Sequence, residues 1–297
     1  MLKRFGLFLL TNFLVIVTVS LILNVALPLL GIQLSGTWAM AVFCGVFGMT
    51  GAFISLWISK WMAKRAYNLQ IIDSTTQDPY LRGIYDMIVR LARQAKLPEV
   101  PEVGVYDAPD PNAFATGPSK SNSLVAFSTG LLRSMNQQEV EAVAAHEISH
   151  IANGDMVTMT LLTGIANTFV MFFSRIVASV IDSFMRNDEG EGGLGFIAHF
   201  ALVFVLDTVF MLLASIPLAA FSRAREYRAD AGAAKLTSPN AMASALERLK
   251  QFTEVETQQD SFATAKISSG RRLSLFASHP PLDARIARLK QGRAPGF

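Results

Sequence analysis

The chain has 297 residues, of which 51% are hydrophobic and 16% are charged, with a net charge of +3. Its mean hydropathy of +0.36 is too high for an ordinary soluble protein, and its 21 phenylalanines exclude a disordered chain. The single cysteine, Cys44, excludes an internal disulfide and a cluster of thiolates around a metal. The composition predicts a folded protein in contact with lipid, in which any metal must bind to histidines and carboxylates.

Four hydrophobic segments approach or exceed the roughly 20 residues that a helix needs to cross a bilayer. They cover residues 5–30, 38–58, 156–181 and 196–221. Arg175, His199 and Asp207 interrupt the third and fourth segments. Because a lone charge in lipid is costly, we expect Arg175 and Asp207 to pair within the bundle. The alternatives are that they line a wet cavity that admits membrane-embedded substrate, or that Arg175 extends outward to the headgroups. The sequence therefore predicts a multi-pass membrane protein with four transmembrane helices.

Lysines and arginines next to membrane spans indicate orientation, because they are retained on the cytoplasmic side. Basic residues precede the first span and follow the second and fourth, whereas the connection over residues 182–193 is mainly acidic. Both termini and all long polar segments are thus expected in the cytoplasm. The same basic residues favour anionic lipid headgroups, and not nucleic acid, as a partner. They are Lys3, Arg4, Lys60, Lys64, Arg65, Arg223 and Arg225.

The spans divide the chain into three expected domains. Residues 1–60 form an N-terminal transmembrane hairpin, residues 156–221 form a second one, and residues 61–155 and 222–297 together form one cytoplasmic domain. Three short strand candidates in this domain, separated by Pro, Gly, Asn and Ser, predict a small antiparallel sheet. The strands cover residues 103–106, 113–116 and 124–128; helices are expected over 81–97, 136–153, 238–252 and 282–291, and a loop over 253–270.

The central motif is HEISH at residues 146–150, inside the expected helix 136–153. Histidines at positions i and i+4 lie about 5–6 Å apart on one helix face, which suits two imidazoles that bind one zinc ion at about 2.0–2.1 Å. Glu147 lies next to that face, where it can take a proton from a water on the metal as a general base. Two surface histidines could share a helix by chance, but the whole HExxH pattern favours a zinc metallopeptidase.

A zinc site needs a further ligand. Glu226 and Asp230 lie at positions i and i+4, so one can bind the metal while the other accepts the far N–H of a ligand histidine. Glu226 is the better ligand candidate, with His279 as the alternative, although a solvated acidic pair would show the same spacing. His199 is excluded, because its helical path places it about 40 Å from Glu226. Asp155 is expected to cap the third span and not to touch the metal.

The sequence resembles the bacterial HtpX heat-shock peptidases, which are related to the eukaryotic CAAX prenyl endopeptidases. The resemblance covers nearly the whole chain and rests on HEISH, on SRAREYRAD at residues 222–230, on PNAFA at 111–115 and on SHPP at 278–281. It implies a mainly α membrane protein of the bacterial inner membrane, with four transmembrane helices and a zincin-like α+β cytoplasmic domain. The implied activity is hydrolysis of misfolded or damaged membrane proteins under stress.

The resemblance also implies roles for individual residues. One Zn²⁺ ion per chain would be bound by His146, His150 and Glu226, with Glu147 as the catalytic base. The remaining matched positions have different roles. Asn112 and Ala113 match an edge strand that holds an extended substrate by main-chain pairing, and His279 would donate to the oxyanion formed in the reaction.

Two other functions compete with a general membrane endopeptidase. A dedicated processing peptidase of the CAAX prenyl type would share every catalytic residue, but two pairs of spans are few for the large chamber of those enzymes. A transporter or channel would use the polar residues within the spans, yet the first two spans have almost none. The sequence leaves the substrates and the oligomeric state open.

Overall fold

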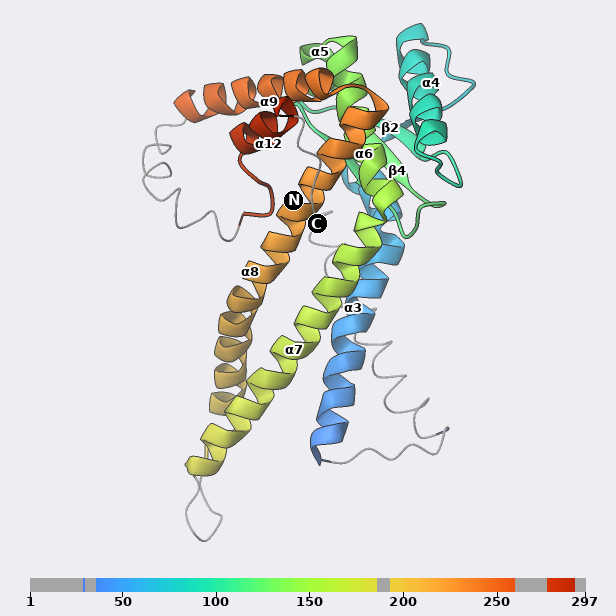
Figure 1. Ribbon diagram of the computed structural model, residues 1–297. Helices are drawn as coiled ribbons and strands as arrows, with labels where there is room; N and C mark the ends of the chain where they lie inside the picture. The colour runs from blue at the N-terminus through green and yellow to red at the C-terminus, as the bar shows by residue number, and fades with distance from the viewer. Residues whose placement is uncertain (1–28, 30–35, 186–192, 260–276, 292–297) are drawn as a thin grey trace. The chain divides into compact units, whose positions relative to one another are not determined.

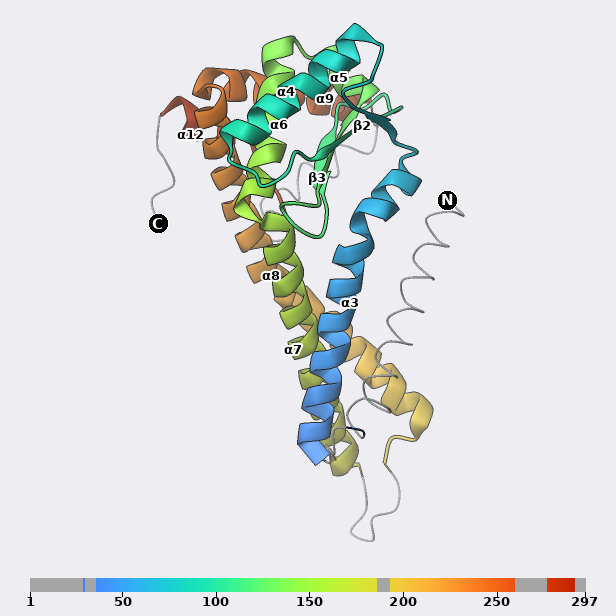
Figure 2. The same cartoon turned by 90° about the vertical axis from the view of Figure 1, so that its right-hand side faces the viewer.

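The computed structural model describes residues 29, 36–185, 193–259 and 277–291. It is mostly helical, with one four-stranded sheet (Figures 1 and 2). The chain divides into two compact units. The first consists of the described residues of Met1–Ser55 and of Met159–Leu218, and the second consists of those of Leu56–Thr158 and of Ala219–Phe297.

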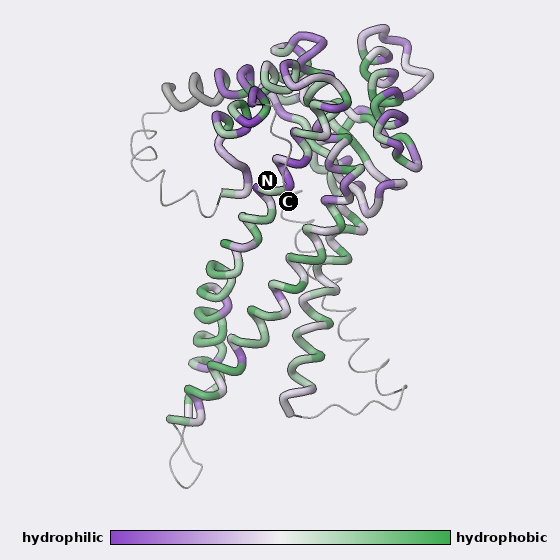
Figure 3. The backbone as a smooth tube through the Cα atoms, viewed as in Figure 1, coloured by the Kyte–Doolittle hydropathy of each residue, from purple (hydrophilic) through white to green (hydrophobic). Residues whose placement is uncertain are grey.

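Three helices in the described residues are long and apolar enough to cross a membrane: α3 (Gly36–Ala66), α7 (Asp155–Phe184) and α8 (Phe196–Leu236). Hydrophobic residues dominate most of their length (Figure 3). The predicted spans 38–58, 156–181 and 196–221 each lie inside one of these helices. The predicted first span, residues 5–30, lies almost entirely outside the described residues.

The first unit holds α3 and α7 in close contact through small residues. A Cβ atom on Gly48 would lie 2.5 Å from Oγ1 and 2.7 Å from the backbone nitrogen of Thr168. A Cβ atom on Gly164 would lie 2.8 Å from the sulfur of Met49. Glycines at both places let the two helix backbones approach, as is common between membrane helices.

The expected pairing of Arg175 with Asp207 is wrong. Arg175 donates from Nη1 to the backbone oxygen of Met171 on its own helix, over 2.9 Å, and its guanidinium lies 5.8 Å from the ring centre of Phe43. Oδ1 of Asp207 is buried and has no hydrogen-bond partner among the described residues. The guanidinium of Arg175 is therefore stabilised by the backbone carbonyl of Met171 and the ring of Phe43, and not by an ion pair with Asp207.

The second unit contains the sheet, whose strand order is β1-β2-β4-β3. β4 pairs parallel to β2 and antiparallel to β3, so the expected antiparallel sheet is wrong and the sheet is mixed. β4 lies between β3 and β2, antiparallel to β3 as expected but in the same direction as β2. The strands are β1 (Gln70–Ile72), β2 (Glu102–Tyr106), β3 (Ala113–Thr116) and β4 (Leu124–Ser128).

Among the described residues, five further helices belong to the second unit. α6 packs against α4, α9 and strand β3, and it lies at the centre of the unit (Figure 2). The helices are α4 (Pro79–Gln94), α5 (Thr129–Ser134), α6 (Gln137–Asn153), α9 (Pro239–Gln259) and α12 (Leu282–Lys290). α9 continues to Gln259, so the predicted loop is wrong for residues 253–259, and residues 260–270 lie outside the described part of the chain.

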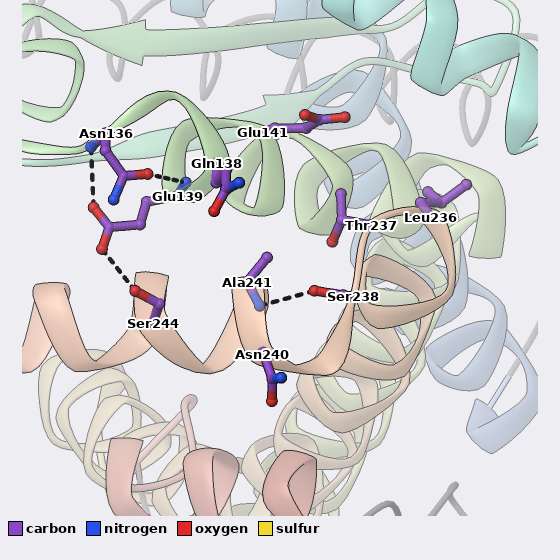
Figure 4. A pocket seen from close by; sticks show the side chains of 10 residues that line it. All are labelled: Asn136, Gln138, Glu139, Glu141, Leu236, Thr237, Ser238, Asn240, Ala241 and Ser244. Atoms are coloured by element: carbon purple, nitrogen blue, oxygen red, sulfur yellow. Dashed lines mark hydrogen bonds between the residues drawn. The ribbon is translucent and has the colours of Figure 1, made fainter.

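The ends of α6 are fixed as the sequence predicts. At its start, Asn136 accepts from the backbone N–H of Glu139, and the Glu139 carboxylate accepts from the backbone N–H of Asn136. The same carboxylate accepts from the hydroxyl of Ser244 on α9, beside a polar groove of about 550 Å³ (Figure 4). At its end, Gly154 has a φ of 71°, which is rarely adopted by other residues, and α7 begins at the next residue.

Candidate metal centre

Two histidines of α6 and a glutamate of α8 meet inside the second unit. The side chains of His146, His150 and Glu226 are all buried. Nε2 of His146 lies 3.1 Å from Nε2 of His150, and these atoms lie 3.6 Å and 3.4 Å from the two carboxylate oxygens of Glu226. Ligand atoms of a tetrahedral zinc ion with bonds of about 2.0–2.1 Å lie about 3.3 Å apart. The three side chains therefore fit one small metal ion.

Close packing between α6 and α8 brings Glu226 to the histidines. A Cβ atom on Gly232 would lie 2.4 Å from Oγ and 2.8 Å from Cβ of Ser149, so only glycine leaves room at this crossing. Glu226 and Asp230, one turn apart on α8, are 2% and 3% exposed. This burial distinguishes them from a solvated acidic pair.

The second nitrogen of each histidine faces an aspartate. Nδ1 of His150 forms a hydrogen bond of 2.6 Å with Oδ2 of Asp155, the first residue of α7. Nδ1 of His146 lies 3.1 Å from Oδ1 of Asp230, but its N–H does not align with that oxygen, so this contact is mainly electrostatic. We expected Asp155 to cap the third span and not to touch the metal; it is the first residue of α7, and its carboxylate also orients His150.

An arginine lies behind each aspartate. Arg285 of α12 donates two hydrogen bonds to Asp230, of 2.8 Å and 2.6 Å, and its Nη1 lies 3.6 Å from Glu226. Arg228 of α8 lies 3.7 Å from Oδ1 of Asp155. Neither arginine was predicted as part of the site from the sequence. Arg285 follows Asp230 by 55 residues, and no local pattern could connect them.

These carboxylates make the site attract positive charge. Burial alone would lower the pKa of His150, but the hydrogen bonds with Asp155 and Glu226 outweigh it and raise the pKa to about 9. The pKa of His146 is also raised, because the contacts with Asp230 and Glu226 outweigh its burial. Imidazoles surrounded in this way by buried carboxylates favour a cation between them.

The other predicted catalytic side chains lie close to this group. Glu147 is buried next to His146 on α6, with 9% of its surface exposed. His279 precedes α12, and its Nδ1 lies 3.1 Å from Oε2 of Glu226 while its side chain is 64% exposed. Arg223 of α8 donates to the backbone oxygen of Ala277 over 2.8 Å, which ties the segment before His279 to the site.

The predicted substrate strand is at an edge of the sheet. In the described part of the chain, β3 pairs only with β4. The backbone oxygen of Asn112 accepts from the N–H of Ser128, and antiparallel hydrogen bonding alternates along a strand. It follows that Phe114 and Thr116 bond to β4, while Ala113 and Ala115 direct their backbone N–H and C=O groups to the free edge. α6 packs directly against this strand.

A metal-binding group on an HExxH helix, in a chain with long apolar helices, defines a membrane metallopeptidase. Residues 81–293 match the profile described as Peptidase family M48. The chain belongs to this family.

Individual relatives agree with this assignment. The chain is 49% identical to Protease HtpX of Shewanella oneidensis and 48% identical to Protease HtpX of Shewanella pealeana. Each match covers 97% of this chain and 99% of the relative. The predicted resemblance and metalloendopeptidase activity are thereby confirmed, and the CAAX processing alternative is not favoured.

A solved structure shares the fold. The crystal structure of S. mikatae Ste24p matches with a TM-score of 0.66 and 21% sequence identity. The match covers 97% of this chain, which spans only 65% of that structure's chain. At this identity the likeness shows the fold and carries no conclusion about substrates.

Proposed function

We propose that the chain is a zinc-dependent endopeptidase with one Zn²⁺ ion bound by His146, His150 and Glu226. The observation that carries this proposal is the spacing of 3.1–3.6 Å between three buried ligand atoms of types that zinc prefers. When bound, the ion would polarise the peptide carbonyl and make water acidic enough to react near neutral pH.

The protein side chains then have separate tasks. Glu147 accepts the proton of the attacking water as general base. His279, held beside Glu226, donates to the oxygen of the peptide carbonyl as negative charge develops on it. Asp230 and Asp155 fix the orientation of the two histidines, and Arg285 keeps the Asp230 carboxylate in place.

Substrate binding uses the free edge of β3. An extended chain would pair with the backbone groups of Ala113 and Ala115, next to the exposed Asn112. Main-chain pairing tolerates many side chains, which suits an enzyme that removes varied misfolded or damaged membrane proteins during stress. Two relatives named Protease HtpX, a name that implies heat shock, support this role.

We further propose a location in the inner membrane of a bacterium. Residues 1–60 and 156–221 form two transmembrane hairpins, and residues 61–155 and 222–297 form the cytoplasmic peptidase domain, which is zincin-like. Three long apolar helices in the described residues and the basic residues that follow the second and fourth spans support this arrangement.

Metal analysis combined with digestion of unfolded casein tests the proposed chemistry. The full chain, purified in detergent, should contain about one zinc per chain, as a single ligand set of this kind implies. Glu147→Gln should retain that zinc but lose casein digestion by several orders of magnitude, because only the proton acceptor is removed. Glu141→Gln is a matched control, since Glu141 lies on α6 but pairs with Arg90.

Full casein digestion by Glu147→Gln would contradict its role as the base. A wild-type chain that digests casein without zinc would contradict the proposed metal.

A further inference from the structure

All three tryptophans of the chain lie on α3. Trp38 is near its start, and Trp57 and Trp61 are near its end. They are 79%, 76% and 46% exposed. Tryptophan is enriched where a membrane meets water, because its ring is amphipathic. These positions on a helix that is long enough to cross a bilayer suggest one tryptophan at one membrane–water interface and two at the other.

The spacing of these tryptophans matches a bilayer. Trp57 follows Trp38 by 19 residues, and the residues between them carry no charge. At 1.5 Å per helical residue this stretch is about 29 Å long. The hydrocarbon core of a bilayer is about 30 Å thick. The distance between Trp38 and Trp57 thus matches the thickness of the hydrocarbon core that a membrane-spanning α3 would cross.

Two lysines occupy the face of α3 beside Trp57 and Trp61, and both contact the sheet. Nζ of Lys60 lies 2.9 Å from Oε1 of Glu102, the first residue of β2, and Lys64 contacts the other oxygen of that carboxylate. Lys60 also donates to Oδ1 of Asn122 over 2.7 Å. These contacts lie within the second unit and join the end of α3 to β2 and to the β3–β4 loop.

We propose that Trp57 and Trp61 lie in the headgroup layer of phospholipids, and that the cluster of Lys60, Lys64, Glu102 and Asn122 holds the β3–β4 loop at the same level. The face of α3 that carries Trp57 and Trp61 continues the exposed apolar surface of this helix, so we expect lipid to lie against it. Two lysines against one glutamate leave a net positive charge, which suits anionic headgroups. The peptidase unit is thereby attached to the membrane surface through one edge of its sheet.

The strand register extends this placement to the proposed substrate strand. Glu102 pairs with Leu124, and Leu124 pairs with Thr116, so these residues form one row across the sheet. Two strand spacings place Thr116 about 10 Å from Glu102, and Ala113 about 10 Å farther along β3. A chain bound along β3 would have one end near the headgroups. This consequence rests on the proposed role of β3, whereas the placement of the tryptophans does not.

Quenching by brominated lipids measures the depth of Trp57. Trp38→Phe and Trp61→Phe together leave Trp57 as the single tryptophan in the full chain, which is then reconstituted in phosphatidylcholine vesicles. Bromines at carbons 6 and 7 of the acyl chains should quench Trp57 more strongly than bromines at carbons 11 and 12. Equal quenching, stronger quenching by the deep bromines, or no quenching would overturn the proposal.

A tryptophan at position 80 is the control. Tyr80→Trp is combined with Phe at positions 38, 57 and 61. Tyr80 is 54% exposed, and its hydroxyl donates to the backbone oxygen of Leu132. Leu132 follows the Ser128 end of β4, whereas Glu102 pairs with Leu124 at the other end of that strand, so Tyr80 lies far from the proposed membrane contact. Neither bromine position should quench it, and quenching comparable to that of Trp57 would show a non-specific signal and overturn the proposal.

A second measurement is independent of the tryptophan variants. Ser121 is an exposed residue of the β3–β4 loop, and Gln77 is an exposed residue before α4. With Cys44 replaced by Ser, a nitroxide at Ser121→Cys should relax faster with a nickel chelate tethered to lipid headgroups, and one at Gln77→Cys should not. Equal effects at both positions would overturn the loop placement. The same measurements on Glu147→Gln separate the loop placement from catalysis, because they require no turnover.

Discussion

At the scale of single residues, the two ligand histidines differ in how firmly the aspartates behind them are held. Asp230, behind His146, receives two hydrogen bonds from Arg285, whereas Asp155, behind His150, has Arg228 at 3.7 Å. However, Asp155 makes the shorter contact with its histidine, at 2.6 Å. A carboxylate in this position fixes the ring and makes the opposite nitrogen a better ligand. Metal affinity should therefore depend on Asp155 although it contacts no metal itself.

We expect Asp155→Asn to lower the affinity for zinc by about 10- to 100-fold, the usual effect of losing such a partner. The amide can still accept a hydrogen bond from His150 but lacks the negative charge. Competition with a chromogenic chelator measures the affinity. Asp86→Asn is the control, because Asp86 is exposed and pairs with Arg82 on α4. Unchanged zinc affinity in Asp155→Asn would show that Asp155 does not tune His150 as a ligand and only begins α7.

At the scale of elements, local patterns predicted the helices that carry the site, but not how the strands pair. The cap residues and HEISH motif of α6 lie within one stretch of sequence, so reading them requires no tertiary information. Strand β4 is LVAFS, and all five residues are buried. Such a run looks the same beside a parallel or an antiparallel neighbour. Its direction relative to β2 depends on the path of the whole hairpin.

The same limit explains why some residues of the site could not be predicted from the sequence. Arg285 becomes part of the site only because α12 packs near α8, and nothing in the sequence near Arg285 indicates Asp230 as its partner. Asp155 was recognised as a residue at a helix start, but its contact with His150 depends on the sharp turn at Gly154. β1 has only three residues, too few for a clear strand pattern.

The crossing of α6 and α8 is tested by adding one methyl group. Gly232→Ala would place Cβ within 3 Å of both side-chain atoms of Ser149, so the helices must move apart. We expect a loss of about 1–3 kcal/mol in stability, typical of overpacking, and weaker zinc binding as Glu226 is displaced. Thermal unfolding and chelator competition measure the two effects.

Two further variants make this result specific. Gly83→Ala is the matched control, because a Cβ atom there meets nothing within 4 Å and alanine favours a helix more than glycine does. Ser149→Gly in the Gly232→Ala chain removes the obstructing atoms and should restore zinc affinity. Full zinc affinity in Gly232→Ala alone would show that this close contact does not position Glu226.

At the scale of the whole molecule, the helices that bear the candidate site continue into the hydrophobic segments. Asp155 is the first residue of α7, and Glu226 lies on α8 five residues after the predicted end of the fourth span. This connection would explain why the proposed membrane hairpin at residues 156–221 interrupts the peptidase sequence. The chain places parts of one site at both ends of that hairpin.

The proposed orientation predicts which positions react from outside the cell. In a chain with Cys44→Ser, a cysteine at Met185, an exposed residue after α7, should react with a membrane-impermeant maleimide. A cysteine at Ser121 should react only after the membrane is opened, because the proposed orientation places the β3–β4 loop on the cytoplasmic side. The reverse pattern would require the opposite orientation of the peptidase domain.

Helix continuity also predicts where substrates are cut. The five residues that separate Glu226 from the predicted end of the fourth span are about 8 Å of helix. A metal bound there is close to the membrane surface, where a large folded protein has poor access. Loosened segments of membrane proteins, in contrast, reach the site directly. Cleavage should therefore occur in cytoplasmic segments close to the substrate's own span.

A series of reporters measures this preference. Each reporter carries one cleavable sequence at an increasing distance from a transmembrane helix, and the control carries the same sequence on a folded soluble protein. In intact membranes, cleavage should be fastest for short, flexible connections and slowest for the soluble carrier. The Glu147→Gln chain accounts for cleavage by other proteases. Equal cleavage of all reporters would mean that the catalytic residues act away from the membrane surface, despite the short helical connection to Glu226.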